Sequence, residues 1–356
     1  MPTTRISIII PVYNGGDHFR QCLESIEDSV RSPDEVIVVV DGSTDNSWQI
    51  AETFNTTVLR LAQNSGPARA RNMGAAAAQG DILFFVDADV TLHPETLGLV
   101  EQRFQQVPTL SALIGSYDDA PGASNFLSQY KNLFHHYTHQ VSSENISTFW
   151  GACGAIRRTT FQAVEGFDER YRKPCIEDIE LGYRLTKAGY LIRLYKDIQV
   201  KHLKRWEFGS LLKAEIFYRA IPWTALILRQ KTMNSELNLS ASNRFSVVCV
   251  FALALTLLVT LLSVFFGTLV SVLWMPFLVA ILLTLVVTLL MINIDVYNFF
   301  YDKRGLWFTL RVIPWHWLYF FYGGAAFAYG TGSYALSSWF SWNGLSWNNP
   351  VLKRRQ

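Results

Sequence analysis

The stretch GDILFFVDAD, residues 80–89, decides both the fold class and the chemistry that this chain can support. Residues 82–86 form an unbroken apolar run of strand length, rich in residues that suit a pleated sheet. Asp87 and Asp89 follow at once, and two carboxylates beyond the end of a buried strand can bind one divalent cation. The alternative is an ordinary turn after the strand, in which both acids are merely solvated.

Segments of strand and helix character alternate on both sides of this stretch. Further strands are predicted at 6–12, 35–40, 57–61 and 110–117. Helices are predicted at 17–29, 46–54, 68–78 and 91–106. This alternation predicts βαβ units and a parallel sheet with flanking helices. The polar loops that follow three of the strands should then meet at the carboxyl edge of the sheet, where open α/β sheets bind ligands.

These loops carry groups that suit a nucleotide diphosphate. Tyr13 can form a wall for the base, and Asp41 can accept a hydrogen bond from a base N–H or a ribose hydroxyl. A cation on Asp87 and Asp89 would bridge the phosphates, and Arg71 adds positive charge. The sequence contains neither GxGxxG nor GxxxxGK[ST], which argues against a dinucleotide fold and a P-loop. Asp41 has the alternative role of an ordinary turn acid.

Four motifs occur in order: IIIPVYN at 8–14, VDGSTD at 40–45, NSGPARARNMG at 64–74 and VDAD at 86–89. Together they resemble the inverting family 2 glycosyltransferases of GT-A fold, of the membrane-anchored bacterial type, over residues 7–206. The resemblance implies a Rossmann-like, mostly parallel α/β sheet with flanking helices. Within these motifs it implies nucleotide-sugar binding by Pro11, Tyr13, Asn14, Asp41, Arg71, Asp87 and Ala88. The family often has two acids before the Gly-Ser-Thr turn, and Val40 here replaces the first.

The second half of the site follows along the chain. FWGACGAIRR, residues 149–158, looks like the family's small-residue strand beside the sugar, which implies that Trp150 and Gly151 bind the donor. Glu177 and Asp178 stand at the start of a helix predicted over 178–188. Transfer to a hydroxyl needs a base that takes the acceptor proton. The resemblance assigns this catalytic role to Asp178 and donor binding to Glu177, with helix capping as the alternative for Asp178.

Histidines suggest how the metal site is completed. His202 ends a strand predicted at 198–202, and the resemblance implies that it binds Mn²⁺ or Mg²⁺ with Asp87 and Asp89. A buried structural imidazole is the alternative. Three further histidines lie in a polar, aromatic segment, at His135, His136 and His139. Because no acid or cysteine completes a ligand set around them, we expect a solvated or acceptor-facing helix there.

Composition separates the front of the chain from its back. The chain has 356 residues, of which 50% are hydrophobic, and residues 245–294 and 312–352 contain no charge. Segments 245–269 and 273–294 each exceed the ~20 residues that span a bilayer, with a turn bracketed by Gly267 and Pro276. An apolar stripe with basic residues predicts an interfacial helix at 207–229. A third, aromatic-rich segment at 311–336 either crosses the membrane or lies in its interface.

Basic residues flank the predicted hairpin on both sides. They are Arg229, Lys231 and Arg244 before it, and Lys303, Arg304 and Arg311 after it. The positive-inside rule therefore places both ends in the cytoplasm, and no signal-peptide pattern opens the chain. We expect a multi-pass protein of the cell inner (plasma) membrane with a cytoplasmic catalytic domain. A formal net charge of +2 gives no nucleic-acid footprint.

The predicted domains are a GT-A domain at 1–206, an interfacial helix and linker at 207–244, a transmembrane hairpin at 245–294 and a cytoplasmic loop, third membrane segment and tail at 295–356. The predicted function is metal-dependent, inverting transfer of one sugar from a nucleotide-diphosphate sugar to a hydroxyl of a lipid or lipid-linked acceptor. A UDP-sugar is favoured, with GDP and dTDP open. The alternatives are a polyprenyl-phosphate glycosyltransferase and a catalytically inactive GT-A membrane scaffold. The sugar, acceptor, metal and oligomeric state are left open.

Overall fold

The computed structural model describes residues 4–230, 240–267 and 269–342. Its chain divides into two compact units, Met1–Ala214 and Glu215–Gln356. Lys231, part of the predicted linker and the predicted tail from 343 onward lie outside the described residues.

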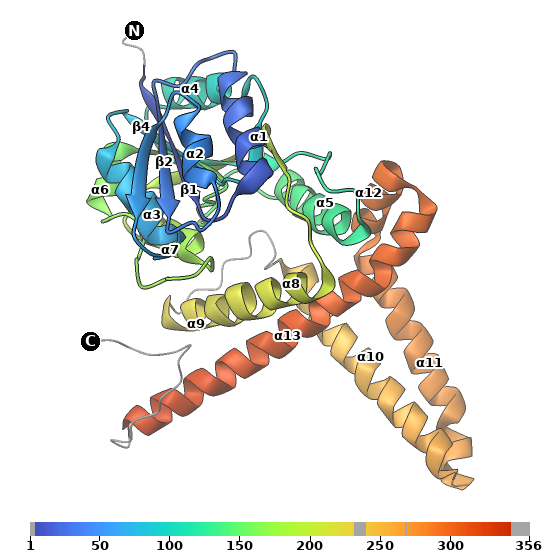
Figure 1. The fold of residues 1–356 in the computed structure, drawn as a ribbon. Helices are drawn as coiled ribbons and strands as arrows, with labels where there is room; N and C mark the ends of the chain where they lie inside the picture. The colour runs from blue at the N-terminus through green and yellow to red at the C-terminus, as the bar shows by residue number, and fades with distance from the viewer. Residues whose placement is uncertain (1–3, 231–239, 268, 343–356) are drawn as a thin grey trace. The chain divides into compact units, whose positions relative to one another are not determined.

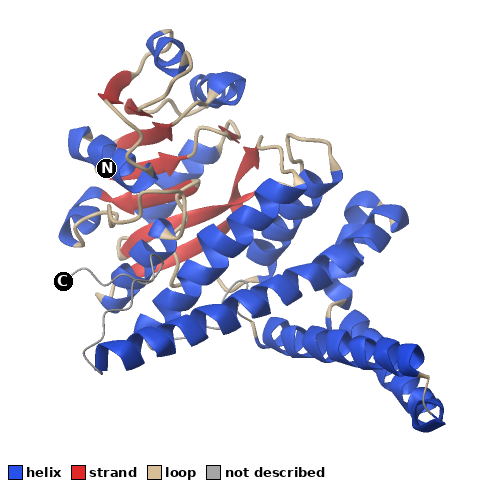
Figure 2. Ribbon diagram, turned by 60° about the horizontal axis from the view of Figure 1, so that its bottom comes forward, coloured by secondary structure: helices blue, strands red, loops and turns tan. Residues whose placement is uncertain are grey.

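A mixed eight-stranded sheet forms the centre of the N-terminal unit, in the order β3-β2-β1-β4-β7-β6-β8-β5 (Figure 2). Pairing is parallel between β1 and β2, β2 and β3, β1 and β4, and β6 and β8, whereas β4–β7, β6–β7 and β5–β8 are antiparallel. The strands are β1 (Ile6–Val12), β2 (Glu35–Asp41), β3 (Thr57–Leu61), β4 (Ile82–Val86), β5 (Val90–Leu92), β6 (Leu110–Tyr117), β7 (Cys153–Arg157) and β8 (Leu191–His202).

Helices cover both faces of this sheet. Successive residues of a strand point to opposite faces, and Phe84 and Phe85 of β4 accordingly join two separate cores. Phe19 of α1 packs in the first core, and Ala70 of α3 packs in the second. The helices of this unit are α1 (Gly16–Glu27), α2 (Ser47–Glu52), α3 (Pro67–Ala77), α4 (Thr96–Gln106), α5 (Phe126–Val141), α6 (Arg158–Ala163), α7 (Glu177–Lys187) and α8 (Phe208–Lys213). The predicted α/β sheet with flanking helices is confirmed.

One local prediction in this unit is wrong, and one of two alternatives left open for another segment is excluded. The helix expected from 91 begins only at Thr96, because Val90–Leu92 is the short edge strand β5, paired with β8. The helix that carries the three histidines was expected to be solvated or to face the acceptor, and the solvated alternative does not hold for two of them. His136 and His139 are buried, and their Nδ1 atoms lie 2.7 and 3.1 Å from the carbonyl oxygens of Tyr117 and Gly115 in β6. Contacts with a strand distant in sequence therefore decided both outcomes.

The C-terminal unit is helical (Figure 1). Two of its described helices, α10 (Ala241–Phe266) and α11 (Leu269–Ile292), contain windows long and apolar enough to cross a membrane. Pro276 lies inside α11 rather than at the turn, whereas Gly267 caps α10 as expected. The helix expected at 207–229 is divided into α8, a π-helical segment η1 (Ala214–Ala220) and α9 (Ile221–Gln230). The remaining helices are α12 (Ile294–Arg304) and α13 (Leu306–Trp342).

Candidate active site at the carboxyl edge of the sheet

The loops after β1 and β2 meet, as the parallel sheet predicts. The amide of Asn14 donates to Ser43 Oγ at 3.0 Å, and the amide of Thr44 donates to Asn14 Oδ1 at 2.8 Å. Asn14 has a φ of 52°, in the left-handed region that asparagine tolerates better than most residues. Tyr13 beside it is 52% exposed, and Pro11 is half-buried in β1. Asn14 therefore ties the two loops together, while the Tyr13 ring faces solvent.

Asp41, at the end of β2, has a structural task in addition to its predicted one. Its buried carboxylate accepts hydrogen bonds from the backbone amides of Ser65 and Gly66, at 2.7 and 2.9 Å. These bonds hold the loop that leads into α3, at a glycine with a φ of 96°. Each carboxylate oxygen keeps a second acceptor position. The prediction that Asp41 meets the nucleotide therefore stands beside this role in the loop.

Arg71 is the centre of the site. It projects from α3, is buried, and joins two acids: its Nη2 lies 2.7 Å from Asp87 Oδ1 and its Nη1 lies 2.8 Å from Glu177 Oε1. Burial opposes the charge of the guanidinium, but Asp87 and Glu177 outweigh it, so the pKa of Arg71 is raised. A Cβ on Gly151 would lie 2.8 Å from Arg71 Cζ, which explains why a glycine stands there. The structure thus brings four predicted donor-binding residues together.

Asp178 lies at the start of α7 beside this ion-pair cluster. Its Oδ1 accepts a hydrogen bond from the amide of Ile179 at 2.8 Å, and its Oδ2 accepts one from the amide of Gly151 at 3.1 Å. Burial and the neighbouring Glu177 raise the pKa of Asp178 to about 6, against the opposing effect of Arg71. A carboxylate with a pKa near the working pH, held in one orientation, suits a general base.

Asp89 and His202 face each other across the pairing of β5 with β8. Val90 is opposite His202 in register, and His202 Nε2 lies 3.5 Å from Asp89 Oδ2. The pKa of Asp89 is lowered, because His202 and Lys204 outweigh the effect of burial. On its other side, His202 Nδ1 lies 2.7 Å from Asn132 Oδ1 in α5. The His202 ring is therefore fixed on one side while its Nε2 is aimed at a carboxylate.

The chemistry of these groups fits a divalent cation. A neutral histidine that donates from Nδ1 to Asn132 presents the lone pair of Nε2, as metal-binding histidines do, whereas a protonated one pairs with Asp89. That lone pair and Asp89 Oδ2 are two acceptors 3.5 Å apart, an arrangement that a cation or a proton must stabilise. Asp87, two residues before Asp89, has one oxygen paired with Arg71. Among the described residues no three such side chains are yet gathered into a ligand cluster.

Trp150 connects this region with a group of aromatic rings. Its ring centroid lies 4.7 Å from that of Tyr117 and 4.9 Å from that of His135. Tyr117 in turn stacks on His202, with ring centroids 4.5 Å apart and planes 9° apart. Ala88 is half-buried and packs against the core. Trp150 therefore stands beside Gly151 on one side and beside the His202 ring system on the other.

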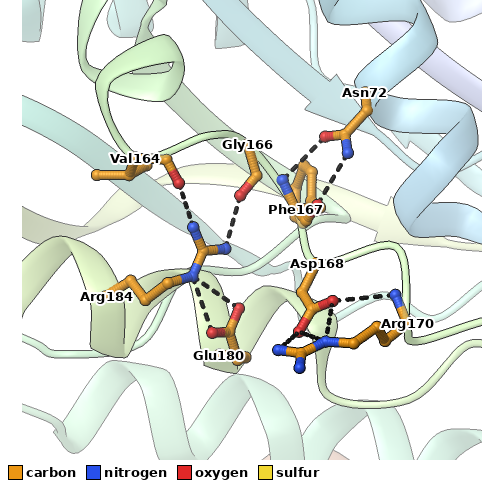
Figure 3. Close-up of polar contacts among 8 residues, drawn as sticks. All are labelled: Asn72, Val164, Gly166, Phe167, Asp168, Arg170, Glu180 and Arg184. Atoms are coloured by element: carbon orange, nitrogen blue, oxygen red, sulfur yellow. Dashed lines mark hydrogen bonds and ion pairs between the residues drawn. The ribbon is translucent and has the colours of Figure 1, made fainter. Parts of the chain in front are cut away.

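The loop between α6 and α7 is fastened beside the site (Figure 3). Asn72 Oδ1 accepts from the Phe167 amide, and Asn72 Nδ2 donates to the Phe167 carbonyl oxygen, both at 2.8 Å. The guanidinium of Arg184 donates to the Gly166 carbonyl oxygen at 2.6 Å. Arg71 Cζ then lies 5.4 Å from the centre of the Phe167 ring. The loop thereby positions an aromatic face against the buried arginine.

Sequence reasoning missed the supporting residues Asn72, Tyr117 and Asn132. Asn72 directly follows Arg71, so its presence in a matched motif was a usable signal. Asn132 and His202 are 70 positions apart, and no local pattern links them.

Comparison with known proteins gives the class of the N-terminal unit. Residues 7–164 match the family model described as glycosyl transferase family 2, and residues 132–206 match the one described as N-terminal domain of galactosyltransferase. The fold is similar to the solved mannosyltransferase PcManGT from Pyrobaculum calidifontis in complex with GDP-Man and Mn²⁺. The TM-score is 0.53 at 19% identity, over 81% of this chain and 87% of that one. The predicted GT-A-like fold is confirmed.

Curated relatives agree on the family. The uncharacterized glycosyltransferase YibD of Escherichia coli (strain K12) is 44% identical over 96 residues, which are 26% of this chain and 28% of YibD. Glycosyltransferase AglE of Haloferax volcanii is 27% identical over 270 residues, 71% of this chain and 80% of AglE. The chain spans only 27% to 38% of the length of the first three curated relatives it matches. Residues 7–164 of the N-terminal unit thus match glycosyl transferase family 2, the family that the four motifs predicted.

Proposed function

We propose that this protein is a metal-dependent, inverting glycosyltransferase that moves one sugar from a nucleotide-diphosphate sugar to an acceptor hydroxyl. The observation that carries the proposal is Asp178. It is a carboxylate with a pKa raised to about 6, held by two amides beside the buried Asp87–Arg71–Glu177 cluster. A purely structural turn needs neither a buried arginine between two acids nor a third carboxylate next to them.

In the proposed reaction, Asp178 accepts the proton of the acceptor hydroxyl as its oxygen attacks the anomeric carbon. The bond from that carbon to the diphosphate breaks on the opposite face, so the configuration is inverted. Arg71 orients Asp87 and contributes fixed positive charge near the leaving group. Asp87, Asp89 and His202 would hold a divalent cation, Mn²⁺ or Mg²⁺, which supplies further charge stabilisation to the diphosphate.

The donor side of the site uses the other predicted residues. Tyr13 and Asp41 are proposed to contact the base and ribose, with Pro11, Asn14 and Ala88 alongside. Trp150 and Gly151 are proposed to line the sugar pocket. A UDP-sugar is our preferred donor.

We further propose that α10 and α11 lie in a membrane and that the acceptor is a lipid or a lipid-linked sugar. The core helix of a soluble protein is mostly buried, but only 11% of the apolar window in α10 and 6% of that in α11 are buried. Arg244 precedes the uncharged run, and Lys303 and Arg304 follow it. This distribution supports a plasma-membrane protein with cytoplasmic ends. The domain limits 1–206, 207–244, 245–294 and 295–356 remain part of the proposal.

A polyprenyl-phosphate acceptor is the competing reaction, since an acceptor that is already an anion needs no base. The raised pKa of Asp178 favours a hydroxyl acceptor over this reaction. An inactive membrane scaffold is disfavoured by the intact Asp87, Asp89 and Asp178.

The test uses the purified full chain with UDP-, GDP- and dTDP-sugars, Mn²⁺ or Mg²⁺, and membrane lipid extract. We expect nucleotide diphosphate release that depends on the metal and rises with lipid. Release that persists in chelator, or in Asp89→Ala, would contradict the metal assignment. An absence of release with every donor, despite metal-dependent donor binding, would favour the scaffold.

A further inference from the structure

The C-terminal unit contains a cavity that the proposed reaction does not use. It has a volume of about 360 Å³, within the ~300–1,000 Å³ range of small-molecule sites. Its walls come from η1 and α9, from the first turns of α10, and from the middle of α13. The described lining residues all lie between 215 and 327, whereas the predicted reaction residues end at His202.

Most of the cavity wall is apolar. Trp223 and Ile227 come from α9, Val247 comes from α10, and Phe327 comes from α13. An aromatic and aliphatic wall favours a hydrocarbon over water, because burial of apolar surface is the main driving force for such binding.

The polar part of the wall carries a net positive charge. Arg219 and Arg244 contribute two formal positive charges, and Glu215 contributes one negative charge. The Glu215 carboxylate is 5% exposed and pairs with Arg219 Nη1 at 2.9 Å. Glu215 and Arg219 both lie in η1, and π-helical segments occur often at functional sites. A guanidinium favours a phosphate, which it can bind through two hydrogen bonds.

Arg244 also stands at a boundary in the chain. It is the last charged residue before the uncharged run 245–294. If α10 lies in a membrane, as proposed above, Arg244 is at the level where lipid phosphates meet hydrocarbon. The cavity therefore combines an apolar wall with a cationic group at the height of a lipid headgroup.

We propose that this cavity binds one anionic phospholipid, with a hydrocarbon chain against Trp223 and Phe327 and the phosphate at Arg244 and Arg219. The proposal rests on the membrane placement of α10 and α11, but not on the transfer reaction. We assign a phospholipid rather than the acceptor, because every described lining residue belongs to the C-terminal unit and none is a predicted reaction residue.

Two glycines of α13 provide a matched test. Gly323 lines the cavity, and a Cβ added there meets no atom within 4 Å. Gly323→Leu therefore adds a bulky side chain at the cavity wall, and its Cβ meets no clash. Gly332 has equally open surroundings but does not line the cavity, so Gly332→Leu is the control for changed helix propensity. Gly324 is unsuitable, because its Cβ would lie 2.5 Å from Phe251 Cε2.

The experiment measures lipid retention by native mass spectrometry of the detergent-purified full chain. Samples are incubated with phosphatidylglycerol, phosphatidylcholine or an isoprenyl phosphate. We expect wild type and Gly332→Leu to retain one phosphatidylglycerol and Gly323→Leu to bind it at least about tenfold more weakly, a loss of ~1.4 kcal/mol. Arg244→Gln should lose the preference for phosphatidylglycerol over phosphatidylcholine.

Equal retention by wild type and Gly323→Leu would overturn the proposal, as would retention of the isoprenyl phosphate but not of phosphatidylglycerol. Flotation with liposomes separates this failure from failure of the membrane placement. All variants should float. If wild type does not float, the membrane placement is wrong, whereas flotation with unchanged retention in Gly323→Leu rejects the lipid site alone.

Discussion

The two units depart from ordinary burial in opposite directions. The N-terminal unit buries charge: Arg71 and Glu177 are each 4% exposed. The C-terminal unit exposes apolar surface, since the windows in α10 and α11 are only 11% and 6% buried. Buried charge and large exposed apolar patches are the informative exceptions in soluble proteins. The buried charges are paired within the chain, and we proposed above that a charged donor binds beside them and that the exposed apolar helices lie in a membrane.

In the N-terminal unit, which buries charge, the variant with the largest expected effect is Asp178→Asn. We expect kcat to fall by about 10²–10⁴, because the amide cannot take the acceptor proton. Donor binding should fall far less than kcat, since the asparagine oxygen still accepts from one of the two backbone amides that bond Asp178. Nucleotide diphosphate release and calorimetric titration of the donor measure the two effects. Undiminished turnover would instead indicate an acceptor that is already anionic.

Removal of the central cation should destabilise the N-terminal unit. Arg71→Met leaves Glu177 buried without its partner, and breaking a buried pair costs about 3–5 kcal/mol. Hydrogen exchange of β4 amides in the full chain measures the opening free energy. Arg170→Met is the control. The Arg170 side chain is 77% exposed, and loss of its exposed pair with Asp168 should cost at most about 1 kcal/mol (Figure 3). If Arg71→Met and Arg170→Met lost the same opening free energy, the Arg71 ion pairs would contribute no more than an exposed pair.

The proposal that the exposed apolar surface of α10 lies in a membrane is tested by Leu258→Arg. Leu258 is 52% exposed, and an arginine at the centre of a membrane helix costs about 2.5–3.5 kcal/mol. We expect a smaller membrane-bound fraction after cell lysis and flotation. Leu306→Arg is the matched control, because Leu306 is 54% exposed but lies near the basic Arg304. If both variants fractionate like wild type, α10 does not cross hydrocarbon.

The next prediction concerns Asn132, whose side chain holds the His202 ring in place. Asn132→Leu removes the acceptor for Nδ1 and should weaken Mn²⁺ binding about 10–100-fold, as loss of a ligand's outer partner commonly does. Asn132→Asp keeps an acceptor and should retain most of the affinity. Electron paramagnetic resonance of free Mn²⁺ measures this without turnover. Wild-type affinity in Asn132→Leu would remove His202 from the proposed site.

The smallest expected effect is the pH dependence. The base must be deprotonated, and the pKa of Asp178 is raised to about 6, so kcat should fall about tenfold between pH 7 and pH 5. Stability should respond with the opposite sign. The folded state binds this proton more tightly than the unfolded chain, whose aspartate pKa is ~3.9, so this group favours folding as pH falls from about 6 towards 4. A kcat that is flat across this range would contradict the assignment.

Local sequence predicted most of the N-terminal unit, because parallel strands leave a regular signal. The loops after β1 and β2 meet through Asn14 and Ser43, as strand order alone required. β5 was not predictable in the same way. Val90 and Leu92 become a strand only because β8 lies beside them. The buried histidines of α5 were missed for the same reason, since their partners are carbonyl oxygens of β6.

The sequence by itself determined the family, the acids after β4 and the two long apolar helices, because each of these depends on residues that are close together in the chain. Only the tertiary structure decided that Arg71 joins Asp87 to Glu177, that Asn132 orients His202, and that η1, α10 and α13 enclose a cavity. The physical reason is distance along the chain. Glu177 is 106 residues from Arg71, and contacts of that range follow from packing rather than from local pattern.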